Sequence, residues 1–110
     1  MKTTILILTP LLVLLTNLNV QAADAKENWE KHCAKCHGTD GKGDTKMGKK
    51  LEVKDYTDAK VQAEMKDDEM AKVIKEGRKE GDKTKMKPFS EFLNDEEIKA
   101  MVAYVRTLKK

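Results

Sequence analysis

The two cysteines of the chain and one of its two histidines lie within five residues, in the stretch Cys33-Ala34-Lys35-Cys36-His37. Thiols and imidazoles form disulfides, ligate metals and react with electrophilic groups. This stretch could therefore close a disulfide, share a metal ion, or hold a larger prosthetic group. The rest of the sequence discriminates between a disulfide, a metal site and a prosthetic group.

The simpler uses of these side chains fit the sequence poorly. A thioredoxin-like C-x-x-C needs a βαβ setting, and the sequence has no such pattern. A structural zinc site needs four ligands, usually in two spaced pairs, and His32 is poorly placed to be the fourth. A plain disulfide stays an alternative in an oxidising compartment, although it gives His37 no role. C-x-x-C-H is also the attachment signature for c-type haem.

The spacing of the motif explains that chemistry. Residues three and four apart share one face of a helical turn, so Cys33 and Cys36 can both reach the two vinyl groups of a porphyrin and form thioether bonds. His37 then stands over the ring centre, where an imidazole nitrogen can bind iron. We therefore predict a single haem c, held covalently by the two cysteines and ligated by His37.

The first 22 residues have the pattern of a secretory signal peptide. Lys2 precedes an apolar stretch over residues 5–18, and Val20-Gln21-Ala22 places small side chains where signal peptidase cuts, so we expect cleavage after Ala22. An uncleaved membrane anchor is the alternative, but polar residues interrupt a stretch that falls short of about 18–20 apolar residues. We predict an exported domain of residues 23–110.

The composition indicates one small domain with a thin core. The chain has 22 Lys and Arg against 19 Asp and Glu, a balance that argues against nucleic-acid binding. It has one Trp, two Tyr and two Phe. A domain this short buries only about 60% of its unfolded surface, and a disulfide within the motif would close too small a ring to add much stability. An apolar prosthetic group would complete the interior.

The pattern beyond residue 22 predicts helices joined by Gly- and Lys-rich loops, without convincing period-two alternation. The last predicted helix has an apolar stripe that includes Ile98, Met101, Val102 and Val105, with acids at its start and lysines at its end. Residues 38–50 and 77–92 are predicted to be open loops. The predicted helix starts are Asp24, Thr57 or Asp58, Asp67 and Asn94. The fold class is therefore all-α.

A second axial ligand has to come from elsewhere in the chain, because His32 lies on the same segment as His37. The candidates are Met47, Met65, Met70, Met86 and Met101. Met70 and Met101 lie on apolar stripes, where methionine is usually core filler, and Met65 lies at a helix end. Met86 precedes Pro88, which stiffens its loop. We predict Met86 as the ligand, with Met47 a distant second.

These motifs resemble those of small class I c-type cytochromes of the bacterial single-haem kind. The resemblance covers most of residues 23–110: Trp29 before CAKCHG, then GKGDTKMGKKL, DDEMAKVIKEG, KMKPFSEF and NDEEIKAMVAYVRTLKK. It implies a small cytochrome c fold of about four to five helices packed around one haem. It also implies that the first and last helices cross, with Trp29 near Tyr104 or Met101, and that the protein is a periplasmic or otherwise extracytoplasmic electron carrier.

The resemblance assigns roles to the site residues and has two departures. It implies Cys33 and Cys36 as thioether anchors, His37 as proximal ligand and Met86 as distal ligand. The family often has a proline near Lys49 whose carbonyl receives the other N–H of the proximal histidine, whereas here a Lys49 or Lys50 carbonyl would have to serve. The common Met-Pro pair is Met86-Lys87-Pro88 here.

With both axial positions filled, we expect a soluble monomeric electron carrier and not an enzyme, free of the membrane once the signal peptide is removed. Six lysines on the flanking segments could form a basic surface for an acidic redox donor and acceptor, although scattered solubilising lysines are an equal alternative; they are Lys31, Lys35, Lys79, Lys83, Lys85 and Lys87. The rival functions are a haem sensor or peroxidase with an open sixth site, a cytochrome subunit of a larger oxidoreductase, and a non-haem thiol or metal module.

Overall fold

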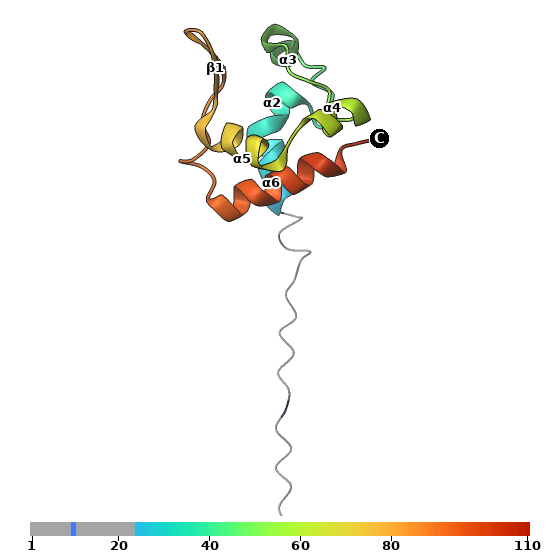
Figure 1. Ribbon diagram of the computed structural model, residues 1–110, viewed down its shortest axis with the longest axis vertical. Helices are drawn as coiled ribbons and strands as arrows, with labels where there is room; N and C mark the ends of the chain where they lie inside the picture. Colours follow the sequence, from blue (N-terminus) through green and yellow to red (C-terminus); the bar gives the residue numbers. More distant parts are fainter. Residues whose placement is uncertain (1–9, 11–23) are drawn as a thin grey trace, which may run out of the picture.

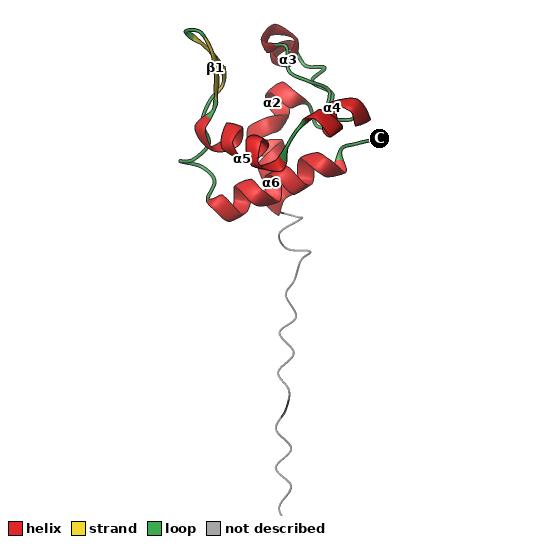
Figure 2. Ribbon diagram, viewed as in Figure 1, coloured by secondary structure: helices red, strands yellow, loops and turns green. Residues whose placement is uncertain are grey.

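The structure is a computed structural model that describes Pro10 and residues 24–110, so the predicted signal peptide and its cleavage site lie outside the described residues apart from Pro10. Helical residues 24–28 continue into a π-helical turn. The elements that follow are η1 (Trp29–Cys33), α2 (Ala34–His37), α3 (Lys46–Leu51), α4 (Ala59–Glu64), α5 (Asp67–Glu76), β1 (Arg78–Glu80), β2 (Lys83–Met86) and α6 (Asp95–Thr107). Helices dominate the described part of the chain (Figure 2), which confirms the predicted class.

Helix α6 forms the base of the domain (Figure 1). Its predicted cap is confirmed: the Asn94 side chain accepts a hydrogen bond from the Glu97 N–H at 2.8 Å, and the Glu97 carboxylate accepts one from the Asn94 N–H at 3.1 Å. Such a capping box satisfies two of the unpaired N–H groups at a helix start. The capping box therefore fixes the start of α6, the helix whose apolar residues face the core.

The core lies between α6 and the segment that contains Trp29. The rings of Trp29 and Tyr104 are 5.5 Å apart between centroids, as the predicted crossing of the first and last helices requires. Among the described residues, Trp29 and Met101 are the large side chains that are completely buried. The whole cluster consists of Trp29, Cys33, Ile74, Phe89, Leu93, Ile98, Met101, Val102 and Val105. This small core confirms the thin interior that the composition indicated.

Helix α3 overlaps residues 38–50, where the sequence predicted only a loop. It begins after Thr45, whose Oγ1 accepts from the Gly48 N–H at 2.8 Å. The prediction was wrong because α3 has no buried apolar stripe: Met47 is exposed, and Gly48 is the residue of the helix that is buried. A side chain at Gly48 would collide with the carbonyl oxygens of Cys36 and Gly43. Close backbone packing, which leaves little trace in a sequence, therefore positions α3 against α2.

Strands β1 and β2 form an antiparallel hairpin within residues 77–92, where no strand was predicted. The hairpin projects from the end of α5, away from the body of the domain (Figure 1). All of β1 and the first half of β2 are exposed. Because neither strand buries one face, the apolar alternation that would indicate strands is missing.

The predicted starts of the other helices are close to the observed ones. Asp58 caps α4, accepting from the Lys60 N–H at 2.8 Å. Asp67 was predicted to cap α5 but is its first residue, and its carboxylate pairs with the Arg106 guanidinium at 2.8 Å instead. Asp24 is helical and is the first residue described after the gap, so its predicted role as a cap is not tested. The element boundaries therefore follow tertiary contacts as well as capping preferences.

Candidate functional site

The two cysteines of the motif lie at the junction of two helical turns. Cys33 is the last residue of η1, and Cys36 and His37 end α2. Cys33 is buried, Cys36 is half-buried, and both are free thiols. Burial, and to a lesser extent the adjacent Cys36, raise the pKa of Cys33 to about 12, so this thiol is protonated at neutral pH. Because neither cysteine is in a disulfide, both sulfurs are available to bond a larger group.

His37 is buried between two aromatic rings. Its ring centroid lies 5.7 Å from that of Trp29 and 5.1 Å from that of Tyr56, which stacks on it at 22°. Its Nδ1 is buried and has no hydrogen-bond partner among the described residues. Burial lowers the pKa of His37 to about 4, so the imidazole is neutral at pH 7. A neutral imidazole is the form that binds metals, whereas an unpaired buried nitrogen costs stability.

Hydrogen bonds fix the backbone of the motif. The Trp29 Nε1–H donates to the Gly38 carbonyl at 3.0 Å, the Gly43 N–H donates to the His37 carbonyl at 2.8 Å, and the Thr45 hydroxyl donates to the Cys36 carbonyl at 2.6 Å. Each bond joins a carbonyl of the motif, or of Gly38 directly after it, to a residue outside α2. Contacts within the protein therefore hold the turn in place, both from the segment before it and from the loop after it.

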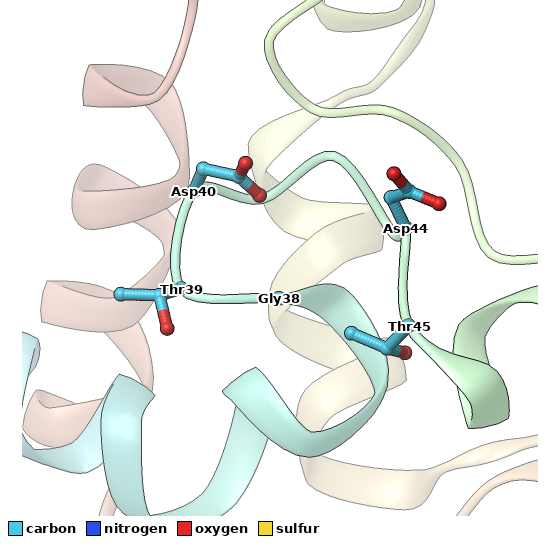
Figure 3. Close-up of a pocket in the computed structure, with 5 residues that line it drawn as sticks. All are labelled: Gly38, Thr39, Asp40, Asp44 and Thr45. Atoms are coloured by element: carbon cyan, nitrogen blue, oxygen red, sulfur yellow. The ribbon is translucent and has the colours of Figure 1, made fainter.

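The loop that follows the motif forms a pocket open to solvent, lined by Gly38, Thr39, Asp40, Asp44 and Thr45 (Figure 3). None of the predicted ligands lines it. The Asp40 carboxylate accepts from the Lys42 N–H at 3.0 Å, and the Asp44 carboxylate pairs with Lys49 at 3.1 Å. These acids therefore shape the loop, and the candidate site is the apolar region around His37.

Met86 reaches the apolar cluster from the hairpin. It is the last residue of β2, is half-buried, and packs against the cluster that includes Trp29 and Cys33. Gly77 permits this approach: a Cβ there would lie 2.6 Å from the Met86 carbonyl oxygen, and its φ of +78° favours glycine. Of the other candidates, Met47 is exposed, Met101 is buried in the core, and Met65 and Met70 pack against its edge.

Two features of the site differ from what the sequence suggested. The Lys49 carbonyl accepts from the Glu52 N–H at the end of α3, and His37 Nδ1 donates to neither the Lys49 nor the Lys50 carbonyl in the described part of the chain. Tyr56, which the sequence analysis did not select, covers one face of the imidazole. The one sequence feature that could have pointed to Tyr56 is that the chain has few aromatic residues, so each of them is a candidate for the core or the site.

Comparison with known proteins now identifies the chain. A family model described as cytochrome c matches residues 22–109. The chain belongs to the cytochrome c family. Covalently bound haem c and haem-based electron transfer go with that family, and c-type cytochromes are typically extracytoplasmic. The small c-type cytochrome predicted from the motif is thereby confirmed.

Solved structures agree with this assignment. The cytochrome is similar to KustC0563, described as a c-type cytochrome, with 38% identity and a TM-score of 0.70 over 78% of this chain and 98% of that one. A tyrosine-to-phenylalanine mutant of Kustc0563 is also 38% identical, with a TM-score of 0.68 over 78% and 99% of the respective chains. A search of curated proteins by sequence found no match. The predicted cytochrome c fold is confirmed.

The residues around the motif fit haem c. Two free thiols three residues apart precede a buried, neutral imidazole whose Nδ1 has no partner in the described part of the chain. They adjoin an apolar cluster that could hold a porphyrin face. Among the described residues, no helix is long and apolar enough to cross a bilayer.

Proposed function

We propose that this cytochrome is a one-electron carrier with a single haem c, tethered by Cys33 and Cys36 and ligated axially by His37 and Met86. The observation that supports this most directly is the neutral, buried imidazole of His37 directly after two free thiols. When bound, haem c supplies reversible one-electron chemistry between its ferric and ferrous states.

Each side chain contributes a distinct property in this proposal. His37 offers a neutral nitrogen, and the rings of Trp29 and Tyr56 keep water from it. The thioether of Met86 would favour reduced iron and so raise the reduction potential relative to a more basic ligand. With His37 and Met86 both holding the iron, no position would be left open for a substrate. The chain therefore acts as an electron carrier and not as an enzyme.

The proposal includes the location of the protein. Cleavage after Ala22 would release residues 23–110 as a monomer into the periplasm, where c-type haem is attached. The typical extracytoplasmic location of c-type cytochromes supports this, together with the pattern of residues 1–22.

Absorption spectra of the exported protein test the ligand set, and replacing Met86 tests the distal ligand. In Met86→Ala we expect the methionine–iron charge-transfer band of the ferric protein to disappear and the reduced protein to bind carbon monoxide. Met47→Ala is the matched control, because Met47 is exposed on α3, and it should keep the band. An unchanged band in Met86→Ala would exclude Met86. Carbon monoxide binding to the unmodified reduced protein would favour the sensor or peroxidase function.

We further propose that an acidic redox protein docks beside the hairpin. Phe92 is 52% exposed, and its ring and that of Phe89 pack against His32. The Lys87 Nζ lies 5.3 Å and 5.4 Å from these two ring centroids. Apolar surface bordered by cations fits a small, weak interface of the kind that electron-transfer partners form.

Most of the predicted basic residues are free to contribute to this surface. Lys85 is the exception, because its side chain is largely buried and its Nζ lies 3.6 Å from the Glu80 carboxylate. The five that are exposed are Lys31, Lys35, Lys79, Lys83 and Lys87. They supply the charge that would attract an acidic partner.

A further inference from the structure

Gln62 is a buried polar side chain in the middle of α4, with 4% of its surface exposed. Its Nε2 donates to the Tyr56 carbonyl at 2.7 Å and to the Val105 carbonyl at 2.9 Å. Its Oε1 accepts from the Arg106 guanidinium at 3.1 Å, which sets the direction in which the amide points. A buried amide is tolerated only when it is satisfied in this way. Here it joins the turn before α4 to helix α6.

The backbone of Tyr56 is held on both sides of its side chain. Its N–H donates to the Gly41 carbonyl at 2.9 Å, in the loop that follows the cysteine motif, and its own carbonyl accepts from Gln62. The next carbonyl, that of Thr57, accepts from the Lys110 N–H at 3.0 Å. With its backbone fixed, the ring has little freedom except rotation about its own side-chain bonds.

The ring held in this way is the one stacked on His37, 5.1 Å away between centroids. An aromatic ring over an imidazole excludes water from that face. Within a site of low dielectric the less charged state of a redox centre is favoured. Water admitted beside the proximal ligand would instead stabilise the more charged, ferric state. The position of the Tyr56 ring therefore bears on the reduction potential.

We propose that Gln62 is a positioning residue that holds the Tyr56 ring against the proximal histidine and thereby keeps the reduction potential high. This inference rests on the proposed role of His37 as an axial ligand. Gln62 itself touches neither the imidazole nor the cysteines in the contacts described, so it acts through Tyr56.

The decisive variant is Gln62→Met, which preserves the length and approximate volume of the side chain but removes both donors. We expect the midpoint potential of the haem-containing protein to fall, with the ferric-to-ferrous ratio at a fixed potential rising three- to tenfold; tenfold corresponds to about 59 mV for one electron. We also expect faster hydrogen exchange at the Tyr56 amide, because the bond to Gly41 then opens more often.

Two comparisons separate positioning from a general loss of stability. Asn94→Ala removes the capping box of α6 without touching Gln62 or Tyr56, and it should lower the melting temperature while leaving the potential unchanged. Tyr56→Leu removes the ring. If Gln62 acts through this ring, Gln62→Met should have no further effect on the potential in the Tyr56→Leu background.

Each outcome of the potential measurements either supports or contradicts the role of Gln62 in positioning the Tyr56 ring. An unchanged potential in Gln62→Met, a fall of equal size in Asn94→Ala, or a full effect that persists without the Tyr56 ring would overturn the inference. If Gln62→Met does not retain haem, Gln62→Asn, whose shorter amide cannot reach both carbonyls, is measured in its place with the same expectation. Failure of the proposed function is recognised separately, because the unmodified protein would then lack the spectrum of a haem c ligated by histidine.

Discussion

At the scale of single residues, the burial of His37 couples the candidate site to the stability of the fold. An imidazole in water takes up a proton below about pH 6.5. In the folded chain, burial between Trp29 and Tyr56 lowers the pKa of His37 to about 4. The folded state therefore requires the neutral imidazole, which is also the state required for a metal ligand. A bond to iron acts in the same direction, because it competes with the proton.

This coupling predicts a loss of stability in mild acid. Between pH 6.5 and 4 the unfolded state binds a proton at His37 that the folded state does not, so the free energy of unfolding falls as the pH is lowered through this range. The expected loss is about 3 kcal/mol, from the difference between the two pKa values. Urea unfolding at a series of pH values measures it.

The other histidine provides the control. His32 is half-buried against Phe89 and Phe92, and His32→Gln should leave the acid-dependent loss in place. A free energy of unfolding that stays constant between pH 6.5 and 4, or a loss that disappears in His32→Gln, would show that His37 is not the group responsible.

At the scale of elements, the hairpin and the end of α5 position Met86. The Phe89 N–H donates to the Ile74 carbonyl at 2.9 Å, which ties the segment after Met86 back to α5. Gly77, at the end of α5, lies directly against this segment, with its Cβ position 2.6 Å from the Met86 carbonyl oxygen and 2.8 Å from the Pro88 nitrogen. The lack of a side chain at Gly77 allows the hairpin to return to the core.

Gly77→Ala should therefore disturb the distal side of the site. Its backbone conformation, with φ +78° and ψ −177°, is one that essentially only glycine adopts, and the added methyl group would displace the Met86 backbone. We expect a loss of about 1–3 kcal/mol in the free energy of unfolding. We also expect a weaker methionine–iron band in the ferric spectrum.

Gly81→Ala, at the tip of the same hairpin, is the matched control. It also has a positive φ, of +60°, but a Cβ there would meet no atom within 4 Å in the described part of the chain. It should cost about 1–2 kcal/mol at most and leave the band intact. Equal effects of the two substitutions on the band would contradict the role assigned to Gly77.

Elements that depend on local sequence could be predicted, whereas those that depend on distant contacts could not. The spacing of Cys33, Cys36 and His37 is local, and the capping box at Asn94 is local as well, so both could be predicted from the sequence. Helix α3 and the hairpin could not, because neither buries a periodic apolar face. Tyr56 and Gln62 owe their importance to contacts with His37 and Val105, far away in the sequence. No pattern of neighbouring residues indicates such contacts.

At the scale of the whole molecule, the C-terminal end of the chain holds together the segments that surround the motif. The Val105 carbonyl accepts from Gln62, and the Lys110 N–H donates to the Thr57 carbonyl. Leu108 packs so closely on the loop after the motif that a Cβ at Gly41 would lie 2.7 Å from its Cδ1. Since the core is small, these contacts of the C-terminal end add to it in holding the segments around the motif together.

The positions of the exposed lysines determine on which side of the molecule an acidic partner would be attracted. The hairpin and α4 lie on opposite sides of the domain (Figure 1), and both have exposed lysines. If an acidic partner docks beside the hairpin, its association rate should fall as ionic strength rises, because salt screens the attraction. The double variant Lys83→Glu with Lys87→Glu should be about tenfold slower at low salt and less dependent on salt.

Lys60→Glu in α4 is the control for this experiment, because it also replaces an exposed lysine with an acid but on the side away from the hairpin. Stopped-flow measurements of electron transfer to a strongly acidic redox protein, over a range of salt concentrations, give the rates. Lys60→Glu should slow the reaction far less than the hairpin variant does. Rates that are independent of salt, or that respond equally to the α4 and hairpin substitutions, would mean that the lysines only solubilise the protein and that the partner is not guided to the hairpin by charge.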